Sequence, residues 1–154
     1  MGKLHLSAVA AVLVAAAIAP AAQARPATDR PGVTYGGMTS AKWPLMVQVS
    51  RDRRQVSYAV AAWAATCTDG PYSTTEEFKQ IPISARGKFA KSYDTGDFQD
   101  GSATVRYAAS IDGKLNRQRS KIAGTVRVMF SVKDAEKGLD YTCDTGTVKY
   151  TLAD

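Results

Sequence analysis

Along most of the chain, apolar positions recur at every second residue, which is the pattern of half-buried β-strands. One such run covers 45–50, and a second begins after the polar segment 51–54 and continues to Cys67. If 51–54 form a hairpin loop, the apolar residues of both runs share one face. The expected pairs are Val49 with Val56, Val47 with Tyr58, and Leu45 with Val60. Residues 59–65 are alanine-rich, so a helix is an alternative there, but the β-forming residues around them favour a strand.

A second hairpin is predicted over 104–115 and 122–132. Folding the chain about 117–120 brings every inward residue of one strand opposite an inward residue of the other. The expected pairs are Leu115 with Ile122, Gly113 with Gly124, Ile111 with Val126, Tyr107 with Phe130, and Val105 with Val132. Two opposed glycines indicate a sharp bend or a close approach of the backbones.

The remaining strand candidates are shorter. Segments 78–84 and 88–93 qualify, and Pro82 favours a sheet edge for the first of them. Segments 139–143 and 147–152 form the last strand, but their inward phases disagree, so we expect a bulge near 145–146. The pattern predicts an all-β fold, an antiparallel β-sandwich or partly closed β-barrel of about seven or eight strands.

The chain begins with the features of a secretory signal peptide. Residues 1–24 contain Lys3, an apolar run over 6–19 and a small-x-small site that ends at Ala24. We expect cleavage after Ala24, a secreted, extracellular protein, a flexible leader over 25–32 and one β domain over 33–154. The alternative is an uncleaved membrane anchor, but the run is short for a bilayer core, and no later stretch is long enough to cross a membrane.

Cleavage removes His5, the single histidine, and Lys3. Without histidine the mature chain has no Ser-His-Asp or Cys-His nucleophile and no imidazole metal ligand. Removing Lys3 from the 20 Lys and Arg leaves 19 against 14 Asp and Glu, a net charge of +5. Cys67 and Cys143 are expected to form one disulfide in an exported protein. A reactive or metal-binding pair fits their wide spacing poorly, and we expect no cofactor.

Charge is sorted by loop if consecutive strands run antiparallel. Loops 51–54, 85–88 and 114–121 fall at one end and are basic, whereas 68–79, 94–101 and 133–140 fall at the other and are acidic. The candidate binding residues are Arg51, Arg53, Arg54, Arg86, Lys88, Lys114, Arg117, Arg119 and Lys121. Such a surface suits an anionic envelope polymer or an acidic polysaccharide. The alternative is that these side chains are solvated hairpin tips, and the lack of interleaved aromatic residues argues against nucleic acid.

The sequence therefore predicts a secreted, non-enzymatic, envelope-associated binding module, which we expect to be a monomer. Two other functions stay open. One is a small hydrolase that uses paired carboxylates at the acidic end. The other is a protease inhibitor that presents a loop at 68–77 around Pro71. Calcium at Asp94, Asp97 and Asp100 is a weaker alternative, because the spacing is not that of an EF-hand.

Several turn and strand segments resemble a group of small secreted bacterial β-domain proteins without an assigned role. The segments are Tyr35-Gly36-Gly37-x-Thr39, Trp43-Pro44, Cys67, Gly87-Lys88-Phe89, Ile111-x-Gly113, Ile122-x-Gly124-Thr125 and Cys143-Asp144-x-Gly146. The resemblance implies an exported single-domain β-protein with one disulfide. It implies no catalytic or binding residue.

Overall fold

The computed structural model describes residues 31–68 and 70–154. The predicted signal peptide, residues 1–24, and its cleavage site lie outside this part, as does most of the predicted leader. The first strand begins at Pro31, two residues before the expected start of the domain.

Nine antiparallel strands make up the described part of the chain, which confirms the all-β prediction and exceeds the expected strand count. They are β1 (Pro31–Met38), β2 (Pro44–Ser50), β3 (Gln55–Cys67), β4 (Gly70–Pro82), β5 (Lys88–Asp100), β6 (Ala103–Leu115), β7 (Lys121–Asp134), β8 (Leu139–Asp144) and β9 (Val148–Ala153). The alanine-rich segment 59–65 lies within β3 and is therefore a strand. No helix that could cross a membrane occurs among these residues.

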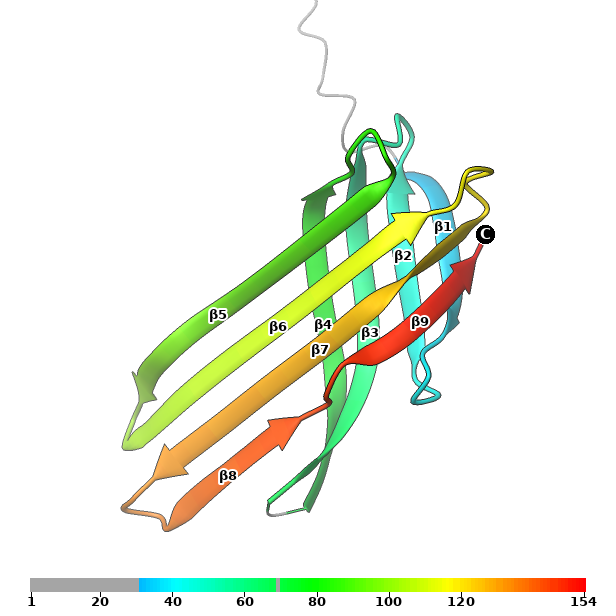
Figure 1. Cartoon of the computed structure of the whole chain (residues 1–154). Helices are drawn as coiled ribbons and strands as arrows, with labels where there is room; N and C mark the ends of the chain where they lie inside the picture. The colour runs from blue at the N-terminus through cyan, green and yellow to red at the C-terminus, as the bar shows by residue number, and fades with distance from the viewer. Residues whose placement is uncertain (1–30, 69) are drawn as a thin grey trace, which may run out of the picture.

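The strands form one sheet that folds back on itself into two layers (Figure 1). The hydrogen-bonded order is β4-β3-β2-β1-β9-β7-β6-β5, and β8 pairs with both β7 and β3. The layers β1–β4 and β5–β9 are joined through β1 and β9 on one side. On the other side β4 and β5 are the two edge strands, so the barrel is only partly closed. Pro82 ends the edge strand β4, as the sequence predicted.

The pairing of β6 with β7 follows the predicted register at every position, including Gly113 opposite Gly124. The two glycines allow a close approach. A Cβ atom on Gly124 would overlap the Asp112 carbonyl oxygen and lie 2.7 Å from Gly113 Cα. A Cβ atom on Gly113 would lie 2.7 Å from the hydroxyl of Tyr150, which donates a hydrogen bond to the Asp112 carbonyl (2.6 Å).

The predicted register between β2 and β3 is only partly correct. Val49 pairs with Val56, but the register shifts beyond this pair, so Val47 faces Ala59 and Leu45 faces Ala61. The extra residue turns Tyr58 outward, where its hydroxyl donates to Glu77 (2.7 Å). The small side chains of Ala59 and Ala61 then pack inward. The sequence pattern favoured the larger residues of this strand for the inner face, so it did not predict this register.

The predicted last strand is present as two strands, β8 and β9, that line successive parts of β7. Met129 pairs with Asp144 and Val126 with Val148, an offset of one residue across the break. This offset is the bulge that the two inward phases required. The break lies at Thr145 and Gly146, and Gly146 has a φ of 62°.

The disulfide between Cys67 and Cys143 is present, as predicted. The two cysteines are a backbone pair of β3 and β8 and are both buried. The bond therefore fastens the two layers to each other near the end opposite the 116–120 loop.

Candidate anion-binding site

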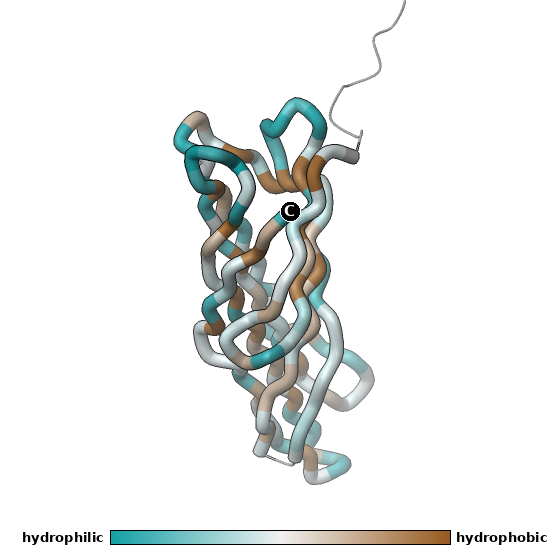
Figure 2. Tube along the Cα trace, turned by 90° about the vertical axis from the view of Figure 1, so that its right-hand side faces the viewer, coloured by the Kyte–Doolittle hydropathy of each residue, from teal (hydrophilic) through white to brown (hydrophobic). Residues whose placement is uncertain are grey.

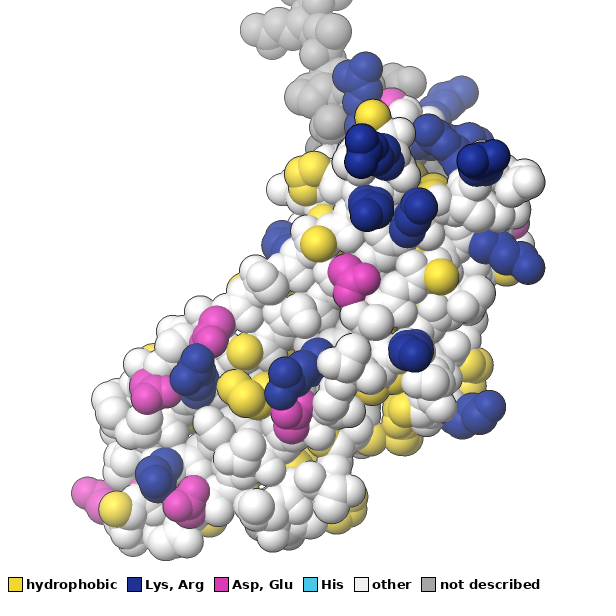
Figure 3. All heavy atoms as spheres, viewed as in Figure 1, with side chains coloured by type: hydrophobic (Ala, Val, Ile, Leu, Met, Phe, Trp, Pro, Cys, Tyr) yellow, Lys and Arg dark blue, Asp and Glu magenta, His cyan; other side chains and the backbone are white. Residues whose placement is uncertain are grey.

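Three loops lie at one end of the molecule: 51–54, 83–87 and 116–120 (Figure 1). They are hydrophilic along much of their length (Figure 2). We call the nine exposed cations on and beside these loops the basic cap. Its members are Arg51, Arg53, Arg54, Arg86, Lys88, Lys114, Arg117, Arg119 and Lys121. They are the residues that the sequence singled out, and Lys and Arg side chains gather at this end in Figure 3.

The loop 116–120 is held by its own first residue. The Asn116 side-chain oxygen accepts hydrogen bonds from the backbone N–H groups of Ser120 (2.9 Å) and Lys121 (3.2 Å). The N–H of Arg119 donates to the Asn116 carbonyl (3.0 Å), and Arg119 has a φ of 56°. These bonds fix the backbone from which the arginines project.

The loop 51–54 is closed in a similar way by Asp52. Its carboxylate accepts hydrogen bonds from the Ser50 hydroxyl (2.6 Å) and from the backbone N–H of Arg54 (3.1 Å). The same two bonds, that from Ser50 first, hold the pKa of Asp52 below its usual range. Asp52 is the single carboxylate within the three loops, and its hydrogen bonds stabilise the loop 51–54.

Contacts between elements keep the loops in place relative to the barrel. The Leu115 N–H donates to the Gly87 carbonyl (3.0 Å), which ties the β4–β5 turn to β6. The buried hydroxyl of Tyr35 donates to the Arg119 carbonyl (2.5 Å), so β1 supports the 116–120 loop from inside. Burial raises the pKa of Tyr35, against the opposing effect of the Arg53 charge. The hydroxyl therefore remains a donor at neutral pH.

A hollow of about 690 Å³ lies between the β4–β5 turn and the β6–β7 loop. Five cap cations line it: Arg86, Lys114, Arg117, Arg119 and Lys121. Lys88 lines a second hollow of about 680 Å³, which it shares with Lys114. The three arginines of the loop 51–54 do not line the first hollow. The structure thus concentrates five of the nine predicted residues around one concave surface.

Salt bridges are absent from the cap, whereas they are frequent elsewhere on the described surface. Five salt bridges occur in residues 31–68 and 70–154, and none involves a cap residue. Of the eight other cations in the described ranges, five are paired, as Arg106 is with Asp94 (2.6 Å) and Arg127 with Asp144 (2.6 Å). The other three, Lys42, Lys91 and Lys149, form no salt bridge there. The cap charges are therefore available to an anion outside this part of the chain.

Glu76 is a buried carboxylate and a candidate functional residue that was not predicted from the sequence. It is 7% exposed and accepts a hydrogen bond from the Tyr107 hydroxyl across the gap between the layers. Burial raises the pKa of Glu76. Its neighbour Glu77 points to the other face and binds Lys79 (2.9 Å). Side chains alternate between the two faces of β4, and this places Glu76 on the inner face. The sequence would have indicated a buried carboxylate if the predicted strand 78–84 had been extended toward the N-terminus as far as Glu76.

The predicted acidic loops are mostly strand. β4 begins at Gly70 and pairs with β3 along its whole length, so residues 70–77 form a strand and not the projecting loop that we expected at 68–77 for a protease inhibitor. β5 extends to Asp100, so 94–101 also lies largely in a strand. Asp94, considered as a calcium ligand, binds the Arg106 guanidinium through both carboxylate oxygens (2.6 and 3.1 Å).

Comparison of the chain with protein-family models, with curated proteins and with solved structures found no match.

Proposed function

We propose that this protein is a secreted, non-enzymatic binding module whose basic cap binds an anionic polymer, either an envelope polymer or an acidic polysaccharide. The observation that supports the proposal is the group of five cations around one hollow without an ion pair to any described residue. Fixed cations on a rigid surface bind polyanions by charge complementarity, and guanidinium groups also form paired hydrogen bonds with phosphate, sulfate or carboxylate oxygens.

Secretion and association with the envelope are part of this proposal, and the sequence features of residues 1–24 support secretion. The disulfide is consistent with an oxidising compartment. A hydrolase is less well supported, because the partner of the buried Glu76 is a tyrosine and not a second carboxylate.

The test is retention on immobilised heparin, a sulfated polysaccharide, and binding to inorganic polyphosphate over a series of salt concentrations. Screening shortens the range of exposed charges to about 3 Å at 1 M salt, so binding should weaken steeply as salt rises. The variant Arg117→Gln/Lys121→Gln should elute at clearly lower salt, with a salt slope lower by about two, one for each lost contact.

The matched control is Lys42→Gln/Lys149→Gln, which removes the same charge from exposed residues beside the β1–β2 turn. If both double variants lose the same affinity, net charge alone governs binding and the cap has no special role. Binding that does not change with salt would also overturn the proposal.

A further inference from the structure

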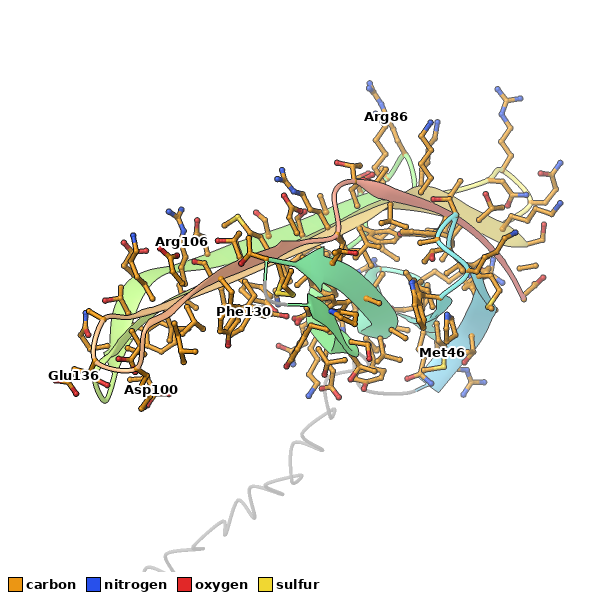
Figure 4. The ribbon with its side chains drawn as sticks, turned by 90° about the horizontal axis from the view of Figure 1, so that it is seen from below. Met46, Arg86, Asp100, Arg106, Phe130 and Glu136 are labelled. Atoms are coloured by element: carbon orange, nitrogen blue, oxygen red, sulfur yellow. A yellow bond between two sulfur atoms is a disulfide. The ribbon has the colours of Figure 1, made fainter. Side chains whose placement is uncertain are left out.

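The end opposite the basic cap carries exposed apolar side chains beside carboxylates. We call this surface the acidic pole and define it by Asp97, Asp100, Glu136, Tyr72, Phe98 and Leu139. The last three are 45%, 43% and 41% exposed and belong to the five most exposed large hydrophobic residues described. In Figure 4 the hairpin tips with Asp100 and Glu136 lie beside each other, at the opposite end from Arg86.

The apolar part of the pole lies on β5–β8 near their tips, where Val105 and Val132 are buried but Phe98 and Leu139 are exposed. Phe98 lies opposite Val105, Val105 opposite Val132, and Val132 opposite Tyr141, so one apolar row crosses four strands. Tyr72 of β4 is the last cover from the other layer, and its ring stacks on Phe130 (centroids 6.1 Å apart). At the β5 end of this row, Phe98 is exposed.

The charges of the pole are also incompletely neutralised. Lys137 is paired with Asp134 (3.2 Å) and Lys133 with Asp140 (3.6 Å), so the local cations already have partners. Asp97, Asp100 and Glu136 form no ion pair with a residue of the described ranges. The Ser102 hydroxyl donates to Asp134 (2.8 Å) and holds the two tips together.

We propose that the acidic pole docks on the basic cap of a second copy of this chain. The two surfaces are complementary: the cap offers cations without described partners around a hollow, and the pole offers projecting carboxylates. Arginine also packs its apolar stem and its guanidinium on aromatic rings, which Tyr72 and Phe98 provide. The inference uses the cap but does not require polyanion binding, and it departs from the monomer expected from the sequence.

The two surfaces lie at opposite ends, so each copy keeps one free surface after docking. Such a heterologous contact does not close at two copies, and it builds linear assemblies at low salt. A polyanion on the cap competes with the pole of the next copy. Self-association and polyanion binding are then mutually exclusive, and heparin should dissolve the assemblies.

The experiment is sedimentation of the purified protein over a concentration series at about 20 mM salt and again at about 0.5 M, where screening is strong. The average mass should rise with concentration beyond two copies at low salt and return to one at high salt. A pole variant, Asp97→Asn/Asp100→Asn/Glu136→Gln, and a cap variant, Arg86→Gln/Arg117→Gln/Lys121→Gln, should each associate at least about tenfold more weakly.

An equimolar mixture of the two variants tests the pairing directly. The intact pole of the cap variant can bind the intact cap of the pole variant, so the mixture should form one-to-one dimers and nothing larger. Phe98→Ser, which changes no charge, should also weaken association. The pole variant should keep its heparin retention, which separates this proposal from the proposed function.

Several results would overturn the inference. They are a monomer at every concentration at low salt, association that stops at two copies, association unaffected by either triple variant, and a mixture that stays monomeric. Near-ultraviolet circular dichroism of each variant confirms that the substitutions leave the fold intact.

Discussion

Replacing Gly124 by alanine tests how strongly the glycine pair shapes the strands that carry the cap. The added Cβ would overlap the Asp112 carbonyl oxygen and lie 2.7 Å from Gly113 Cα. Both contacts are with backbone, which cannot rotate away as a side chain can. β6 and β7 must therefore separate locally.

The cost has two parts. Overpacking costs about 1–3 kcal/mol, and losing one strand-pairing hydrogen bond costs about 1 kcal/mol more. Alanine restricts the unfolded chain and returns about 0.4–1 kcal/mol. We expect Gly124→Ala to lower the free energy of unfolding by about 1–3.5 kcal/mol.

The matched control is Gly36→Ala in β1, where an added Cβ meets no atom within 4 Å and φ is not positive. That variant should be neutral or slightly more stable. Urea unfolding of both variants, followed by fluorescence, gives the comparison. Equal stability of the two would refute the close approach of β6 and β7 as the reason for the glycine pair.

Three further predictions concern the interior. Cys67→Ala/Cys143→Ala removes a crosslink between residues 76 positions apart. In the chain-entropy model this should lower the free energy of unfolding in urea by about 4 kcal/mol. A loss below about 1 kcal/mol would contradict that model for this disulfide. Glu76 has a raised pKa in the folded state, so its charge destabilises the fold at neutral pH and less so as pH falls toward the unfolded value. Glu76→Gln should therefore be more stable than the native protein at pH 7, by a margin that shrinks on acidification, and a constant margin would count against burial as the cause. Tyr35→Phe removes the hydroxyl that donates to the Arg119 carbonyl and should lower the free energy of unfolding by about 1 kcal/mol. Hydrogen exchange of the backbone amides in 116–120 should become faster. Unchanged exchange would exclude a supporting role for Tyr35.

The sequence predicted the fold best where large apolar residues alternate without interruption. The β6–β7 pairing was correct throughout because every inward residue of one strand has an inward partner on the other. The register of β2 with β3 failed where alanines replace large residues inside, because a bulge then costs little core volume. The ends of β4 and β5 were missed because polar side chains dominate these partly exposed edge strands.

For the candidate site, alternating loops were enough to predict which cations share an end. They could not predict which of the nine line a hollow, because that depends on how the β4–β5 turn bends toward β6 through Leu115 and Gly87. Tyr35 and Asn116 were also missed as supports of the loop 116–120. The sequence around Tyr35 does not indicate that its hydroxyl binds the distant Arg119 carbonyl. The sequence around Asn116 does not indicate that its side chain binds the nearby Ser120 N–H.

Five like charges around one hollow repel one another, and none has a described counter-ion to offset that repulsion. Like-charge repulsion destabilises a folded state, and salt or a bound anion relieves it. Neutralising part of the cap with Arg117→Gln/Lys121→Gln should therefore raise the midpoint of thermal unfolding at low salt, although we expect the same variant to bind heparin less well. Lys42→Gln/Lys149→Gln should shift it less. If instead the cap variant is destabilised and the shift does not depend on salt, these side chains serve to hold the loops, and a binding role for their charge loses its physical basis.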